Sequence, residues 1–174
     1  MWLRCLIAAA ALASVNACAS TGLSPRPFPQ PARGSAPAIP SSEPTQRPDP
    51  SEGYAIAGTA LALQGIPYRP GGADPAGFDC SGFVWYVFAQ HGVILPRAVR
   101  EQYQAGRPVD PESVAPGDLL FFSTAVGGAT HVAIAIGGHQ FVHAPSSRGH
   151  VRIEQLASAY WGAKFLGARR VANQ

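Results

Sequence analysis

Cys80, His131 and His143 are the residues of this sequence whose types and order suit covalent chemistry. Cys80 lies in residues 79–83 (DCSGF), which predict a helix that begins at the cysteine and is capped by Asp79. Free N–H groups at a helix start lower the pKa of a thiol, and the thiolate is the nucleophilic form. The charge of Asp79 opposes this effect, so we expect the thiol to need a base nearby.

The two histidines suit that role as a pair. His131 opens one expected strand and His143 lies near the end of the next, at equal distances from Gly137. A hairpin centred on Gly137 makes them cross-strand neighbours on one face, with Cβ atoms about 5 Å apart. One imidazole can then take the thiol proton while the other accepts its ring N–H. Two half-buried histidines without a catalytic role are the alternative.

The first residues are typical of an export signal. Arg4 supplies a positive start, an apolar run covers residues 6–13, and small residues lead up to Cys18. A run of this length does not span a bilayer. We therefore expect residues 1–17 to be a signal peptide, with a buried helix as the alternative.

Cys18 and the residues before it resemble a bacterial lipobox. The resemblance implies cleavage ahead of Cys18 and its diacylation, which holds the protein on a membrane through methylenes worth about 0.8 kcal/mol each. Cleavage near Ala17 or Ala19 without a lipid is the alternative. By resemblance to enterobacterial sorting, Ala19 is compatible with the outer membrane of the cell envelope, facing the periplasm.

These assignments leave one of the three cysteines unexplained. Cys5 leaves with the signal and Cys18 carries the lipid, so Cys80 remains as a single thiol in an exported protein. Such a thiol is inert in the core, bonded to another chain, or kept for its reactivity.

A linker follows the lipidated cysteine and completes residues 18–50. Residues 24–50 are dense in Pro and have almost no large apolar side chains, so they cannot bury enough surface to fold. An extended polyproline segment, at about 3.1 Å per residue, serves as a semi-rigid spacer; a linker of no specific length is the alternative.

From Ser51 onward, nine Arg and Lys against eight Asp and Glu leave a charge of +1. They form no cluster that nucleic acid would require.

The elements that position these side chains are helices first and short strands afterwards. Helical spacing and apolar runs that end at Gly predict helices at residues 51–64, 80–90 and 98–105. Short β-rich segments predict strands at residues 118–122, 131–136, 140–144, 151–154 and 165–171. This order is an α+β pattern, with N-terminal helices packed on an antiparallel β-sheet in one domain of residues 51–174.

Six segments between Tyr54 and Val171 resemble those of a known family. They are residues 65–68 with 71–72, 78–84, 95–97 with 102, 116–122, 131–134 and 141–145. In this order they are similar to the NlpC-type peptidoglycan cysteine peptidases, and the signal, lipid site and spacer are similar to the lipoprotein endopeptidases of that family. The resemblance implies a reduced papain-like fold.

The resemblance also implies a role for each matching catalytic position. Cys80 is the nucleophile, His131 the general base, and His143 the polar residue that orients the base. Asp118 falls in the Pro-Gly-Asp turn of the family, so we expect it to be structural rather than a third triad member.

Three further residues match positions near the substrate. Tyr68 matches a tyrosine beside the thiol that helps to shape the oxyanion site, and packing against Pro67 is its alternative. Ser81 and Arg97 match positions near the cleft. Helix capping by Ser81 and a surface ion pair of Arg97 explain them equally well.

The activity implied by the resemblance is hydrolysis of an amide in the stem peptides of peptidoglycan, D-Glu–diaminopimelate or D-Ala–diaminopimelate. It proceeds through an acyl-enzyme without a cofactor, with the backbone N–H of Cys80 as an oxyanion donor. The alternatives are a lipoprotein that binds stem peptides without cutting them and a related thiol amidase or acyltransferase. A zinc site built from Cys80 and both histidines lacks the usual paired ligand spacings, and we expect no metal.

Overall fold

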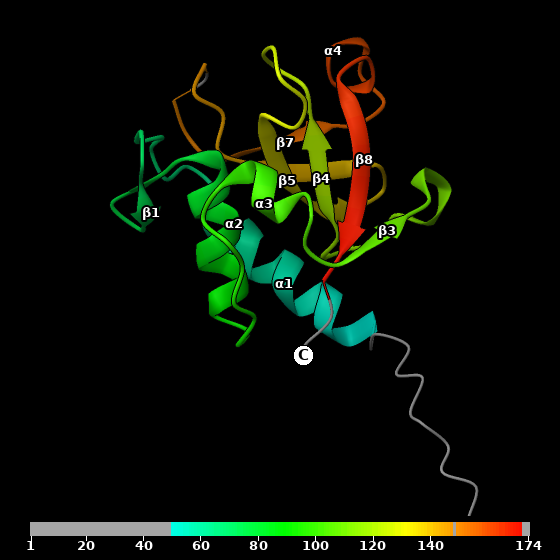
Figure 1. Ribbon diagram of the computed structural model, residues 1–174. Coiled ribbons are helices and arrows are strands. Elements are labelled where there is room, and N and C mark those ends of the chain that lie inside the picture. Colours follow the sequence, from blue (N-terminus) through cyan, green and yellow to red (C-terminus); the bar gives the residue numbers. More distant parts are fainter. Residues whose placement is uncertain (1–49, 148, 172–174) are drawn as a thin grey trace, which may run out of the picture. The chain divides into compact units, whose positions relative to one another are not determined.

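The computed structural model describes residues 50–147 and 149–171 of the chain (Figure 1). The predicted signal peptide, Cys18 and linker residues 19–49 lie outside the described residues. In the part that is described, every helix is too short or too polar to cross a bilayer.

The two long helices lie close to where the sequence predicts them. Helix α1 spans Pro50–Ala62, and α2 spans Cys80–Ala89 and begins at the predicted residue. Helix α3 is shorter than predicted, at Val99–Gln102, because the chain turns there and enters an unpredicted strand. A second short helix, α4 at Ala159–Gly162, and a 3₁₀ turn at Pro111–Ser113 were not predicted either.

The described residues form a six-stranded antiparallel sheet in the order β3-β8-β4-β5-β6-β7. Its strands are β3 Arg107–Val109, β4 Leu119–Phe122, β5 His131–Gly137, β6 Gln140–His143, β7 Arg152–Gln155 and β8 Phe165–Arg170. All five predicted strands are present. A small ladder of β1 Ala73–Asp74 and β2 Gly77–Phe78 precedes α2 and was not predicted.

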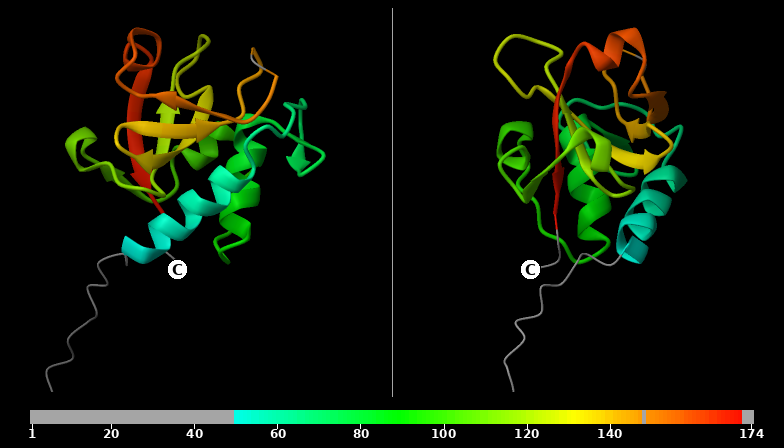
Figure 2. Two further views of the ribbon diagram at one scale, coloured as in Figure 1. Left: turned by 180° about the vertical axis from the view of Figure 1, so that it is seen from behind. Right: turned by 90° about the vertical axis from the view of Figure 1, so that its right-hand side faces the viewer.

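The sheet has an apolar core on each face. Helices α1 and α2 cover one face, where Phe83 and Phe88 of α2 pack with Phe121 of β4; Figure 2 shows the two helices together on that side. The opposite face carries Phe122, Phe141 and Trp161. Because side chains alternate along a strand, β4 sends Phe121 to the helices and Phe122 to the second core, where each buried ring contributes about 1.5–3 kcal/mol.

The hairpin between β5 and β6 is centred one residue later than predicted. Gly138 and His139 form its two-residue turn with φ of 58° at both residues, the conformation that such hairpins favour. In the paired register, Ile134 opposite Val142 and Ala135 opposite Phe141, the position opposite His143 is Ala133. The prediction that His131 and His143 face each other directly is therefore wrong. They are diagonal neighbours on one face, because the turn and a bulge replace the symmetric loop.

Backbone hydrogen bonds join the loop before α2 to the loop after β6. The amide of Gly65 donates to the carbonyl of Val151 at 2.9 Å, and the amide of Val151 donates to Ile66 at 2.8 Å. The amide of Tyr68 donates to Gly149 at 2.8 Å. The segment that leads to Cys80 is thereby fixed to the one that leaves His143.

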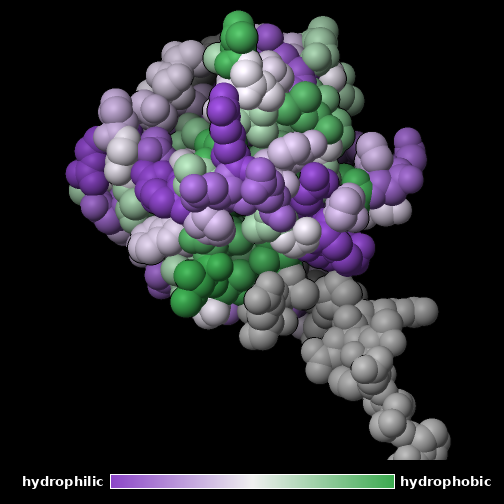
Figure 3. All heavy atoms as spheres, in the orientation of Figure 1, coloured by the Kyte–Doolittle hydropathy of each residue, from purple (hydrophilic) through white to green (hydrophobic). Residues whose placement is uncertain are grey.

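The surface in Figure 3 mixes polar and apolar side chains, with a polar band across the middle of the face that is shown. The large apolar residues most exposed in the described part are Tyr54, Ile94, Val126, Tyr160 and Leu166. Scattered exposed apolar residues are normal on a soluble surface.

Candidate active site

Asp79 sets the start of α2 and thereby the place of Cys80. Its backbone is extended, and its Oδ1 accepts the N–H of Gly82 at 2.7 Å, as in an N-cap. The predicted cap is therefore present, and Cys80 lies at the first residue of the helix. Gly82 has no room for a side chain, since a Cβ there would lie 2.0 Å from the carbonyl oxygen of Gly72.

Arg97 and Ser81 belong to the same capping network. The two terminal nitrogens of Arg97 donate to the two carboxylate oxygens of Asp79 at 2.9 and 2.6 Å. Ser81 donates to Asp79 at 3.2 Å and accepts from Arg97 at 2.7 Å. Burial acts to raise the pKa of Asp79, but Arg97, the Gly82 amide and Ser81 hold that pKa below its ordinary value. Both residues thus contact Asp79, the residue before Cys80, and Arg97 forms with it the ion pair that was its alternative.

The surroundings of Cys80 favour its protonated thiol. Burial raises the pKa of Cys80, and the charge of Asp79 raises it further. Backbone amides of Val132, Ser81 and Cys80 itself oppose that rise. The sulfur therefore lies beside Val132, the residue that follows His131 in β5, and it needs a base in order to act as a nucleophile.

His131 and His143 form a buried hydrogen-bonded pair. Nε2 of His131 lies 2.7 Å from Nδ1 of His143, and the side chains are 7% and 0% exposed. Burial lowers the pKa of His131 to about 4. Burial, His131 and Arg152 lower the pKa of His143 to about 2. Both imidazoles are therefore neutral at pH 7.

The pairing defines which nitrogen of each ring is free. With Nε2 of His131 on His143, the ring nitrogen of His131 outside this bond is Nδ1, which can act as a base only if the shared proton is on Nε2. His143 then accepts at Nδ1 and carries its own proton on Nε2, a buried atom without a hydrogen-bond partner among the described residues. A buried pair with this hydrogen bond can act chemically as a base and its orienting group.

Trp161 is a neighbour of both histidines that the sequence analysis missed. Its ring centroid lies 5.5 Å from that of His131 with an angle of 26° between the planes, and 4.9 Å from that of His143 at 88°. Ser158 caps the short helix α4 by accepting the amide of Trp161. The signal in the sequence that could have predicted the start of α4 was Ser158, a capping residue, followed by the aromatic residues 160–161.

A family model described as the NlpC/P60 family matches residues 65–170, more than half of the chain. The chain belongs to the NlpC/P60 family. The mixed helices and antiparallel sheet match solved structures of that family, so the predicted papain-like fold is confirmed.

The chain is similar to several NlpC/P60 proteins. It is 41% identical over 121 residues to the gamma-DL-glutamyl hydrolase of Bacillus subtilis, covering 67% of this chain and 29% of that protein. It is 42% identical over 112 residues to the murein DD-endopeptidase MepS/murein LD-carboxypeptidase of Escherichia coli, covering 64% and 58%. The NlpC/P60 domain structure of the peptidoglycan hydrolase SagA matches with a TM-score of 0.61 and 39% identity, covering 68% of this chain and 98% of that one. The chain thus spans less than two thirds of the length of these two curated relatives.

Tyr68 lies near Cys80 and Asp79. Burial raises the pKa of Tyr68, and the charges of Cys80 and Asp79 raise it further. The half-buried phenol is therefore close to the thiol and remains protonated at neutral pH.

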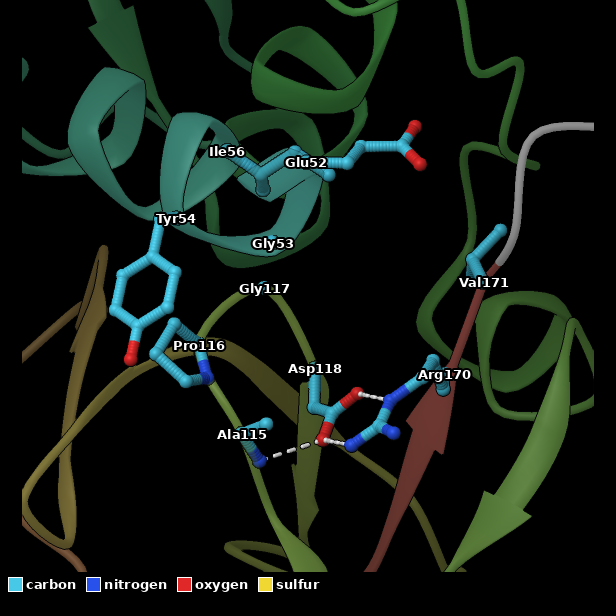
Figure 4. A pocket seen from close by; sticks show the side chains of 10 residues that line it. All are labelled: Glu52, Gly53, Tyr54, Ile56, Ala115, Pro116, Gly117, Asp118, Arg170 and Val171. Atoms are coloured by element: carbon cyan, nitrogen blue, oxygen red, sulfur yellow. Dashed lines mark hydrogen bonds and ion pairs between the residues drawn. The ribbon is translucent and has the colours of Figure 1, made fainter. Parts of the chain in front are cut away.

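Asp118 lies away from the histidine pair and makes structural contacts, as predicted. It is 1% exposed and accepts both the Nε and an Nη of Arg170 at 2.6 Å, and it also accepts the amide of Ala115. Figure 4 shows these bonds in a cavity that neither histidine lines. The bonds join the turn before β4 to strand β8.

A larger cavity, of about 500 Å³, opens beside the histidine pair. It is lined by His143, Pro145, Ser147, Glu154, Ser158, Tyr160 and Trp161. Within residues 50–147 and 149–171, no group of three or more His, Cys, Asp and Glu could hold a metal ion.

Proposed function

We propose that this chain is a cysteine peptidase that hydrolyses an amide bond in the stem peptides of peptidoglycan. Cys80 is its nucleophile, His131 its general base and His143 the residue that orients the base. The 2.7 Å hydrogen bond between the histidines is the observation that carries this proposal. It commits one nitrogen of His131 and leaves the other for the thiol beside Val132.

The reaction follows from these positions. Nδ1 of His131 takes the thiol proton as the sulfur attacks the carbonyl carbon, and the oxygen that becomes negative is met by the N–H of Cys80, with Tyr68 close by. His131 then gives the proton to the leaving amine, which departs as the carbon–nitrogen bond breaks. Water attacks the resulting thioester with His131 again as the base, and the thiol is restored.

The names of the relatives support hydrolysis of a bond in peptidoglycan or in a glutamyl peptide. One of them is named a gamma-DL-glutamyl hydrolase and another a murein DD-endopeptidase. The candidate bonds remain D-Glu–diaminopimelate and D-Ala–diaminopimelate, which the resemblance of the six sequence segments implies.

We also propose that the protein is lipid-anchored through Cys18 at the outer membrane, facing the periplasm. The lipobox-like residues before Cys18 support this. The Pro-rich residues after it would hold the peptidase domain away from the bilayer.

The test is incubation of the purified protein with muropeptides of defined structure, beside a Cys80→Ala variant, with products identified by mass spectrometry. Cleavage by the unsubstituted protein alone identifies both the peptidase and its bond. If the folded protein binds muropeptides but does not cut them, the result would favour a lipoprotein that binds stem peptides. Cleavage of another amide only would favour a different thiol amidase.

A further inference from the structure

The cavity of about 500 Å³ beside the histidine pair is large enough to hold part of a substrate. It is bordered by His143, which is hydrogen-bonded to His131, the proposed base. Tyr160, another of its lining residues, is 57% exposed. A stem peptide that is held at the base therefore has this cavity as a neighbour, and the chemistry of the lining bears on which stem peptides the site accepts.

Glu154 of β7 is the one acidic residue among the described residues that line this cavity. It lies directly opposite Phe141 of β6, and Arg152 lies opposite His143 in the same ladder. Directly paired residues share one face of a sheet, so Glu154 extends from the face that carries the histidine pair. Its side chain is 26% exposed.

The carboxylate of Glu154 has an ion-pair partner but no hydrogen-bond donor in residues 50–147 and 149–171. Its Oε1 lies 3.0 Å from Nε of Arg152, yet that buried nitrogen makes no hydrogen bond in the described part of the chain. The N–H of Arg152 is therefore not aligned with the carboxylate. A half-buried carboxylate in this state gains from a charged donor that enters the cavity, because such hydrogen bonds are among the strongest.

The aromatic part of the lining suits the same kind of ligand. The rings of Tyr160 and Trp161 lie 4.9 Å apart at 90°, and Nζ of Lys164 already lies 4.9 Å from the centroid of Tyr160. Ring faces attract cations and pack against aliphatic chains. Together with Glu154, they favour a ligand that carries an ammonium group on an aliphatic chain.

We propose that Glu154 is a specificity-determining residue, which binds the free side-chain ammonium of diaminopimelate in the stem peptide. This inference rests on the function proposed above. Diaminopimelate has an amine at the end of its aliphatic side chain, and that amine is charged when free and neutral when a cross-link acylates it. The site thus prefers stem peptides without a cross-link. Of the two candidate bonds it favours D-Glu–diaminopimelate, since D-Ala–diaminopimelate in a cross-link uses the amine that Glu154 binds.

The test uses two muropeptides that differ only in this amine, which is free in one and acetylated in the other. Glu154→Gln keeps the shape of the side chain and removes its charge, whereas Glu154→Asp keeps the charge on a shorter side chain. The control is Glu112→Gln, which removes a carboxylate from a separate cavity at the turn between β5 and β6. Thermal unfolding identifies the folded variants, and kcat and KM are measured for both muropeptides.

We expect the unsubstituted protein and Glu112→Gln to prefer the free amine by about tenfold in kcat/KM, the effect of one hydrogen bond to a charged group. Glu154→Gln should lose this preference because KM rises for the free amine alone, with kcat nearly unchanged, and Glu154→Asp should keep part of it. Equal kcat/KM for the two muropeptides in the unsubstituted protein would overturn the proposal. A preference that persists in Glu154→Gln would overturn it as well.

A binding measurement separates this proposal from the proposed function. Calorimetry with Cys80→Ala and with Cys80→Ala/Glu154→Gln compares the two muropeptides without turnover. A protein that cuts neither muropeptide refutes the proposed function, and tighter binding of the free amine that depends on Glu154 would still support the subsite. If Cys80→Ala binds both muropeptides equally, or binds neither, Glu154 does not recognise the ammonium.

Discussion

Arg97 binds both carboxylate oxygens of Asp79, the residue directly before Cys80. The pairing keeps Asp79 charged, and that charge is one of the two factors that raise the pKa of Cys80, after burial. The helix start therefore does not favour a free thiolate, and in the proposed mechanism proton removal depends on His131.

Asp79→Asn should lower the pKa of Cys80, because it removes the charge and keeps an oxygen that can cap α2. The measurement is the rate of iodoacetamide alkylation against pH, which should reach half its maximum at a lower pH. Asp74→Asn, in an exposed pair with Arg69, is the control and should leave the rate unchanged. An unaltered profile in Asp79→Asn would show that burial alone sets the thiol pKa.

Cys80→Ala should abolish muropeptide hydrolysis and leave the fold intact, since the thiol is the group that forms the acyl-enzyme. Circular dichroism and thermal unfolding check the fold, and mass spectrometry of the products checks activity. Hydrolysis near the level of the unsubstituted protein would refute the mechanism.

His131→Ala should cost more activity than His143→Ala. Loss of a general base lowers the rate by about 10²–10⁴-fold, whereas loss of its hydrogen-bond partner leaves the base in place with a less defined orientation. Measured kcat/KM values at pH 7 compare the two variants. The opposite order would mean that the two roles are exchanged.

Acid should destabilise the protein through the same two histidines. Their pKa values are lowered in the fold, to about 4 and about 2, so the unfolded chain binds more protons as the pH falls below 6.5. Stability is therefore present above pH 6.5 and is lost toward pH 4, by about 1.4 kcal/mol per pH unit for each imidazole. Urea unfolding between pH 4 and pH 7 measures this slope. His143→Asn, which removes one imidazole, should roughly halve it.

Cys18→Ser should release the protein from membranes, because the thiol is the proposed site of acylation. Fractionation of cells and labelling with a palmitate analogue check this outcome. Membrane association that persists without label incorporation would exclude the lipid anchor.

The sequence was sufficient for features that depend on local chemistry. The Asp79 cap, the start of α2 at Cys80 and all five expected strands follow from capping residues, apolar runs and Gly boundaries, and the structure has them. The sequence also predicted that His131 and His143 lie on the same face of the sheet, and the hydrogen bond between them shows that they do.

Features that depend on distant contacts could not be predicted. The turn at Gly138 and His139 shifted the hairpin centre by one residue, because left-handed conformations at two successive positions cannot be deduced from apolar patterning. Trp161 was missed because its importance comes from rings on other strands and not from its own neighbours in the chain. Strand β3 was missed because its partner, β8, lies about 60 residues away.

The hydrogen bonds between residues 65–68 and residues 149–151 use only backbone atoms. A main-chain bridge of this kind constrains few of the side chains attached to it, apart from proline at a donating position and the two glycines at 65 and 149, whose φ of 84° and 73° disfavours other residues. Most side chains of these two segments can therefore change over evolutionary time while the distance between Cys80 and His131 stays the same. One scaffold could in this way acquire new substrate preferences by surface substitution alone, without rebuilding its catalytic centre.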